Sequence, residues 1–103
     1  MGIEEIRRKV ADGQYAISFT HTEKLRLRRI KAVDIEEAVK SGNIIEDYPN
    51  DPRGASCLIL GQVGTRPLHI LFARLDAEEI LVVTAYEPDP KEWDEDWQTR
   101  KAR

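Results

Sequence analysis

The sequence predicts an α+β domain in which N-terminal helices pack on a four-stranded antiparallel meander and a C-terminal helix closes the chain. Two patterns predict this fold. Apolar residues recur at helical spacing early in the chain, and four short runs rich in β-branched and aromatic residues follow, separated by turn formers. The 103 residues, of which 41% are hydrophobic and 34% charged, suit one domain spanning residues 1–103.

The N-terminal part of the chain is expected to form short helices. Residues 2–11 carry apolar side chains at spacings of three and four and are followed by an Asp-Gly pair, which is typical of an amphipathic helix stopped by glycine. After the extended stretch "QYAISFT", residues 21–30 are mostly good helix formers. The next helix is expected to begin near Asp34 and to end at Gly42, where glycine suits a left-handed cap.

Four apolar runs follow Gly42 and are expected to be strands. They are "NIIEDY", "ASCLILGQ", "PLHILFARL" and "EILVVTAY", with the turn formers "PNDPRG", "VGTR" and "DAE" between them. Because these intervals are too short for the crossover helix that a parallel pair needs, hairpins are expected to connect the runs into an antiparallel meander.

Alternation along the third and fourth runs predicts which side chains share a face of the sheet. In "PLHILFARL", His69 is expected on the face opposite Ile70. In "EILVVTAY", strict alternation places Ala85 on an entirely apolar face and Thr84 and Tyr86 together on the opposite one. The sheet is therefore expected to have one dry face and one mixed face.

The last segment, "EPDPKEWDEDWQTRKAR", has the signals of a closing helix. Asp89 can cap it, Pro90 suits the first helical position, and Glu92 lies three residues after the cap. Trp93 and Trp97 are four residues apart and would share one side of this helix.

Basic residues are concentrated directly behind His21. They are Lys24, Arg26, Arg28, Arg29 and Lys31. If residues 21–31 form one helix, three of these bases share with the histidine an arc of about 80°. The three are Lys24, Arg28 and Lys31. Like charges at these spacings oppose helix formation, so the pattern requires nearby carboxylates or an anionic partner.

The formal net charge of -3 does not contradict a basic site, because six acidic residues lie between residues 87 and 96. Two interpretations fit this segregation. Either the two segments neutralise each other in the fold or are simply solvated faces, or the basic segment binds a phosphate backbone. His69 likewise fits either a hydrogen-bonded core residue or an acid–base group, and Thr84 and Tyr86 share that ambiguity.

Other chemistry is expected to be absent. His21, Cys57 and His69 lack the paired short spacings of a zinc site, and the chain has no phosphate-binding loop or nucleophile elbow, so neither a metal nor a cofactor is expected. A lone cysteine cannot form an internal disulfide. With no signal peptide and no apolar run of membrane-spanning length, the sequence predicts a cytoplasmic protein without a membrane partner.

Several stretches resemble the uncharacterised bacterial family called domain of unknown function 4258 (DUF4258). They are "YPNDPRGASCLILG", "RPLH" and "TAYEPDPKEW", within a likeness that runs from "FTH" to "TRK". The family usually has a histidine opening its first helix and an arginine eight residues on, here His21 and Arg29. Where it frequently has a further base four residues after the histidine, this chain has Leu25.

The resemblance implies an activity by analogy. The order of helices and meander is distantly similar to toxin ribonucleases of the RelE, BrnT and MqsR types, and members of the family are often encoded beside a small antitoxin-like zinc-finger protein. We therefore expect a metal-independent endoribonuclease with RNA as substrate and a small antitoxin protein as partner. An acid and a base, with cations at the phosphate, are what such cleavage needs.

The residues expected to carry this chemistry fall into three groups. The catalytic group is His21, His69, Arg29 and Tyr86. The group expected to bind RNA phosphates is Lys24, Arg28, Lys31 and Arg66, while Thr84 would orient a neighbour. The alternative is a non-catalytic module in which the mixed sheet face and the basic helix bind a protein partner.

Overall fold

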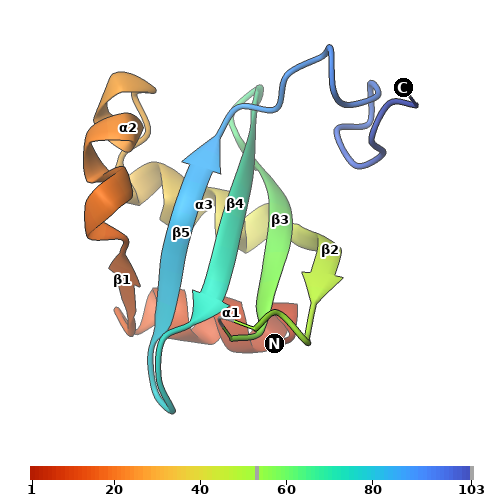
Figure 1. Cartoon of the computed structure of the whole chain (residues 1–103). Coiled ribbons are helices and arrows are strands. Elements are labelled where there is room, and N and C mark those ends of the chain that lie inside the picture. The colour runs from red at the N-terminus through yellow and green to blue at the C-terminus, as the bar shows by residue number, and fades with distance from the viewer. Residues whose placement is uncertain (53, 103) are drawn as a thin grey trace.

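The computed structural model describes residues 1–52 and 54–102, and Figure 1 shows the order of its elements. The helices are α1 (Ile3–Ala11), the 3-10 turn η1 (Phe19–His21), α2 (Thr22–Leu27) and α3 (Ala32–Ser41). The strands are β1 (Tyr15–Ile17), β2 (Asn43–Tyr48), β3 (Ser56–Val63), β4 (Arg66–Arg74) and β5 (Ile80–Tyr86). The chain is thus α+β, with its helices in the N-terminal part. No helix among the described residues is both long and apolar enough to cross a membrane.

The sheet has five strands in the order β1-β5-β4-β3-β2. Strands β2 to β5 form the expected antiparallel meander. The prediction of a four-stranded sheet was incomplete, because β1 pairs with β5 in parallel, with Ala16 opposite Leu81. Short intervals exclude a parallel pair only between consecutive strands, whereas β1 and β5 are separated by most of the chain, which leaves ample length for a crossover.

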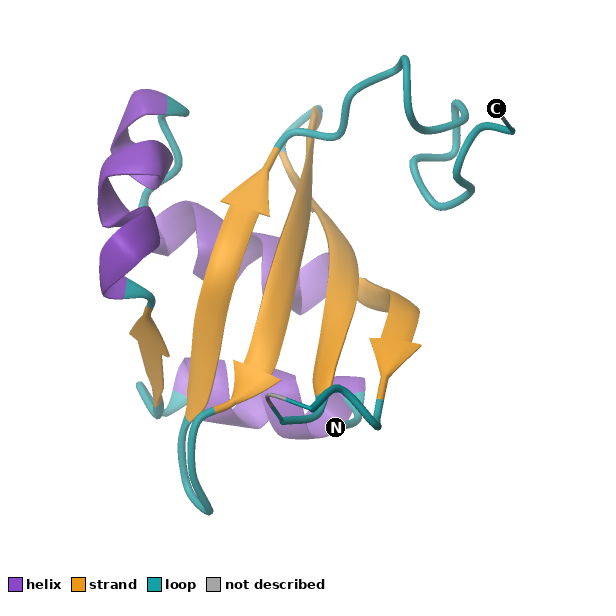
Figure 2. Ribbon diagram, viewed as in Figure 1, coloured by secondary structure: helices purple, strands orange, loops and turns teal. Residues whose placement is uncertain are grey.

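One face of the sheet carries the hydrophobic core. Figure 2 shows α1 and α3 lying across the same face, while α2 stands beside the edge formed by β1. The core combines Ile6 and Val10 of α1, Ile35, Ala38 and Val39 of α3, and Ile59, Leu68, Ile70, Phe72 and Val82 of the sheet. Gly61 permits the close approach of α3, because a Cβ there would lie 2.1 Å from the carbonyl oxygen of Ala38.

The segment from α2 to the end of α3 differs from the sequence prediction at two points. Helix α2 ends at Leu27, and Arg29 has a φ of 57° in the left-handed region, so the bases behind His21 do not share one helical face. Gly42 has a φ of -78° and is not a left-handed cap. Glycine is needed there for space, since a Cβ would lie 2.7 Å from a side-chain carbon of Ile59.

A β-bulge changes the face of the sheet to which the later side chains of β5 point. Leu71 pairs with Thr84 and Phe72 with Val82, so Val83 is an extra residue in the ladder. Val82 and Ala85 both lie buried in the core, whereas Thr84 is half-buried on the opposite face. The prediction from strict alternation, which separated Val82 from Ala85, was therefore wrong beyond the bulge.

The predicted C-terminal helix does not form among the described residues. Asp89 does accept the Lys91 backbone N–H at 2.8 Å and starts one turn. The chain then folds back on itself, with Trp93 bridged to Arg100 and Trp97 at a φ of 60°. Aspartates compete with a helix by bonding nearby backbone groups, and the side chain of Asp96 accepts the next two available N–H groups in this way, those of Gln98 and Thr99.

Candidate functional site

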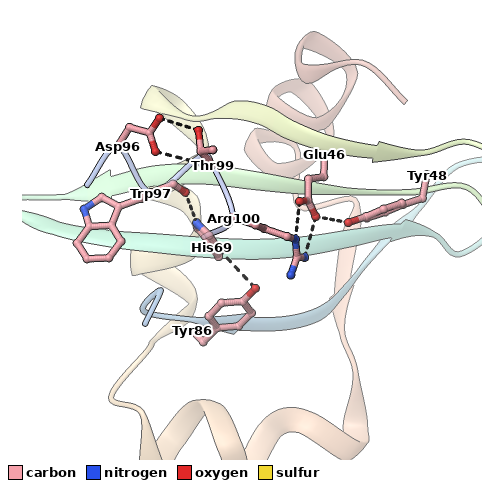
Figure 3. A network of polar contacts seen from close by, with 8 residues as sticks. All are labelled: Glu46, Tyr48, His69, Tyr86, Asp96, Trp97, Thr99 and Arg100. Atoms are coloured by element: carbon pink, nitrogen blue, oxygen red, sulfur yellow. Dashed lines mark hydrogen bonds and ion pairs between the residues drawn. The ribbon is translucent and has the colours of Figure 1, made fainter. Parts of the chain in front are cut away.

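His69 lies at the centre of a polar network on the sheet face opposite the helices (Figure 3). Its side chain is 0% exposed. Its Nε2 lies 2.7 Å from the backbone oxygen of Trp97, and its Nδ1 lies 3.4 Å from the hydroxyl oxygen of Tyr86. Because a carbonyl can only accept, Nε2 carries the proton, which leaves Nδ1 to accept from the Tyr86 hydroxyl.

Aromatic rings enclose the imidazole. The Trp93 ring meets it edge to face with a centroid distance of 4.4 Å, and the Tyr86 ring lies at 5.4 Å. Burial lowers the pKa of His69, against the opposing effects of the Trp97 carbonyl and of the Glu46 carboxylate. The imidazole is consequently held in its neutral form at pH 7.

A carboxylate and a guanidinium complete the network. Arg100 donates from Nε and Nη2 to the two carboxylate oxygens of Glu46, at 2.8 and 2.9 Å. The same guanidinium lies 4.6 Å from the centroid of the Trp93 ring, and the Tyr48 hydroxyl donates to Glu46. The hydrogen bond from Arg100 is the main reason that the pKa of Glu46 is lowered, and the residue stays ionised.

Two arginines join α2 to the ends of β4 and β5. Arg66 donates to the backbone oxygens of Arg28 and Arg29 at 2.7 and 2.9 Å, and its Nε pairs with Glu87 at 2.7 Å. Arg28 donates to the backbone oxygen of Ala85 at 2.8 Å and to the Thr84 hydroxyl at 3.2 Å. Both guanidinium groups, which were expected to bind phosphate, are thus engaged within the protein.

The structure brings some of the expected residues together. His69, Tyr86, Thr84, Arg28 and Arg66 lie along β4 and β5 or reach them from the end of α2. The Thr84 hydroxyl accepts a hydrogen bond from Arg28, and the supporting role expected for Thr84 stays a prediction.

Others of the expected residues lie outside the network. His21 is at the start of α2, and within the described residues no hydrogen bond or ring contact joins it to His69, while its Nδ1 is buried without a hydrogen-bond partner. Lys24, Arg29 and Lys31 are exposed on and behind α2. The described residues contain no group of three or more histidines, cysteines or carboxylates that could hold a metal.

Sequence reasoning did not place Glu46, Tyr48 or Arg100 at the site, and it noted Trp93 and Trp97 only as sharing one side of a helix. The charged Glu46 within the apolar run "NIIEDY" was the only available signal, because a carboxylate in a strand interior needs a partner. Nothing in the sequence indicated that this partner lies 54 residues away, at Arg100.

The comparison with protein families matches residues 21–87 to a model described as "Domain of unknown function (DUF4258)". The matched range begins at His21 and contains β2 to β5 with His69 and Tyr86, but ends before Trp93 and Arg100. No curated protein and no solved structure matches the chain.

Proposed function

The chain belongs to the DUF4258 family, and we propose that it is a metal-independent endoribonuclease, the toxin of a toxin–antitoxin pair. The observation that carries the proposal is the convergence of an imidazole, a carboxylate, a phenol and a guanidinium in one network on the sheet face opposite the helices. These are the groups that metal-free cleavage of RNA requires.

The proposed reaction assigns a role to each group. The ionised carboxylate of Glu46 removes the proton of a ribose 2'-hydroxyl, whose oxygen then attacks the adjacent phosphorus. His69, once protonated, gives its proton to the departing 5'-oxygen, so the products are a 2',3'-cyclic phosphate and a free 5'-hydroxyl. Arg100 neutralises the charge that develops on the phosphate, and Tyr86 supplies a hydrogen bond or a stacking surface for a base.

The part of the C-terminal segment that covers His69, residues 93–97, has to move aside before this site can work, while Arg100 stays paired with Glu46. The Trp97 carbonyl occupies Nε2 of His69, and Trp93, only 3% exposed, covers the ring. Displacement of residues 93–97 returns the imidazole to water, which reverses the effect of burial and raises the pKa of His69 toward its ordinary value of 6.5. The histidine then becomes able to act as the acid.

Cleavage of a long RNA by the full chain in excess EDTA tests the proposal. His69→Ala is expected to lower the cleavage rate by about 10²- to 10⁴-fold, and Glu46→Gln, which preserves the shape of the side chain, by a similar factor. Circular dichroism on each variant separates lost chemistry from lost folding. His21→Ala is the matched control, because His21 is not joined to the network.

The outcomes discriminate between the candidate residues. Loss with His69→Ala and Glu46→Gln but not with His21→Ala supports the proposed pair, whereas loss with His21→Ala alone moves the chemistry to the start of α2. Products other than a cyclic phosphate, or cleavage that depends on added metal, contradict the mechanism.

The complete burial of His69 favours a second candidate, a non-catalytic module that binds a small protein partner of antitoxin type. Both ring nitrogens already have partners, as in a structural histidine. Wild-type protein that leaves RNA intact, yet captures the product of a neighbouring gene tightly, would establish this alternative.

A further inference from the structure

Large apolar side chains are exposed around α2. Phe19 is 93% exposed, Leu27 71% and Val33 64%, and they make up three of the five large hydrophobic side chains that are exposed within the described residues. All three belong to the short stretch that contains η1, α2 and the first turn of α3. Exposure of several large apolar side chains within one short stretch of chain is a feature of interaction sites on folded proteins.

A hollow of about 590 Å³ lies beside α2. Ile17, Leu25 and Ile30 give it an apolar interior. Arg26, Arg29 and Lys31 also line it, and all three are exposed. Its volume is within the range of sites that enclose a ligand, so it can receive one or two side chains of a partner.

The charge around the hollow is unbalanced. Residues 22–34 carry five cations, Lys24, Arg26, Arg28, Arg29 and Lys31, and two carboxylates, Glu23 and Asp34. Glu23 is paired with Arg26, and Asp34 accepts the backbone N–H of Lys31 at 2.8 Å. The surface therefore keeps a net positive charge and attracts an anionic partner.

We propose that this α2 surface, comprising Phe19, Leu27, Val33 and the hollow, binds an acidic amphipathic helix of a protein partner. Apolar side chains of that helix enter the hollow and cover Leu27, and its carboxylates pair with Arg26, Arg29 and Lys31. The proposal does not depend on the ribonuclease proposal, because none of these side chains belongs to the His69 network.

Two other occupants fit the surface less well. A nucleic acid would pair its phosphates with the cations and stack a base on Phe19, but it would gain nothing from the aliphatic side chains of Leu27 and Val33, which a protein partner would cover. A second copy of the chain offers its acidic residues at 87–96 only in a segment of turns, with no helix among its described residues. A helical partner from another protein satisfies both the apolar and the cationic parts.

Binding of a synthetic helical peptide of about 20 residues, with leucines on one face and glutamates on the other, tests the proposal. Amide NMR shifts of the full chain should move for residues 19–33 and not for His69 or Arg100. A scrambled peptide of the same composition should bind at least about tenfold more weakly, and added salt should weaken the designed peptide.

Matched variants locate the contact. Leu27→Ser and Lys31→Glu should each weaken peptide binding by about tenfold, because both side chains are exposed and their loss leaves the fold intact. Leu75→Ser, at an apolar side chain 49% exposed between β4 and β5, and Lys40→Glu, near the end of α3, should leave binding unchanged.

Three results would overturn the proposal. The first is absence of designed-peptide binding, or equal binding of the scrambled peptide. The second is binding of an RNA oligonucleotide that moves residues 19–33 and survives Leu27→Ser. The third is a dimer of the chain that dissociates on Leu27→Ser, which assigns the surface to a second copy.

Discussion

Ile70 and His69 are neighbours in β4 that are equally buried but differently covered. Ile70 and Phe72 face the helices, and both are 0% exposed among apolar side chains. His69, also 0% exposed, points to the opposite face, where it contacts Trp93 and the Trp97 carbonyl of the C-terminal segment. The first cover is a layer of helices with many apolar contacts, and the second is a segment of turns held by a few polar and aromatic contacts. Burial alone thus does not indicate how firmly a residue is enclosed, because a segment held by few contacts opens at a lower free energy than a packed layer of helices.

Phe72→Ala should give the largest effect, since it leaves a cavity in the helix-covered core. We expect the free energy of unfolding to fall by about 3 to 5 kcal/mol, measured by urea denaturation. Leu71→Ala, a half-buried neighbour on the opposite face, is the control and should cost less than half as much. Equal losses at the two positions would show that the two faces contribute alike and would break the comparison.

Trp93→Ala should destabilise mainly the second cover. The buried indole contributes about 2 to 3 kcal/mol to docking of the C-terminal segment. Hydrogen exchange should therefore accelerate at the backbone amides of Asp94 and Lys101, which donate to Thr99 and Glu92, and not at Ile70 in the core. Uniform acceleration across β4 would mean that the segment and the core unfold together.

Local sequence patterns predicted the helix-covered face of β4 and the meander, but they did not predict the features that depend on non-local pairing. The face of Ile70 and Phe72 follows from period-two alternation, and the meander follows from short turns between apolar runs. The bulge at Val83 reverses which side chains of β5 point to the core. This bulge is visible only from the pairing of β5 with β4. The pairing of β1 with β5 is equally non-local.

The sequence predicted some of the residues of the candidate site, but it did not predict how the fold brings the members of the network together. His69 and Tyr86 were expected to act together, and they lie opposite each other in the β4–β5 ladder. The bonding of Glu46 to Arg100 depends on the fold-back of the C-terminal segment, where a cap signal at Asp89 wrongly predicted a helix. The cap formed, but Trp93 is buried in the fold-back and Asp96 bonds the backbone beyond it.

Acidification should weaken the second cover before it affects the first. Burial lowers the pKa of His69 in the folded protein below its ordinary value of 6.5, so the unfolded chain binds the proton more readily. The stability that the neutral imidazole contributes is complete above pH 6.5 and is lost as pH falls toward the lowered folded pKa. Urea denaturation between about pH 7.5 and about pH 5 should show this decline in wild type and a shallower one in His69→Gln.

This pH window isolates the histidine from the nearby carboxylate. The pKa of Glu46 is lowered from 4.5, so its own contribution is lost only at lower pH. Identical slopes for wild type and His69→Gln between about pH 7.5 and about pH 5 would mean that protonation of His69 is not coupled to unfolding.

Arg100→Gln should lower the free energy of unfolding least among these variants. It tests how much the polar contacts of the C-terminal segment contribute beside its aromatic ones. The arginine side chain is 59% exposed, so its ion pair with Glu46 and its contact with the Trp93 ring together contribute about 0.5 to 1 kcal/mol to the free energy of unfolding. Arg26→Gln is the matched control, because its ion pair with Glu23 is exposed on both sides and no aromatic ring contacts it within the described part of the chain. Loss of the Arg26–Glu23 ion pair should change the free energy of unfolding by less than about 0.5 kcal/mol.

Arg100→Gln should also raise the pKa of Glu46, because Arg100 is the chief reason that this pKa is lowered, and carboxyl NMR shifts would follow the change. An unchanged pKa of Glu46 in Arg100→Gln would mean that the ion pair does not persist in solution and that the second cover is held by Trp93 and the Trp97 carbonyl alone.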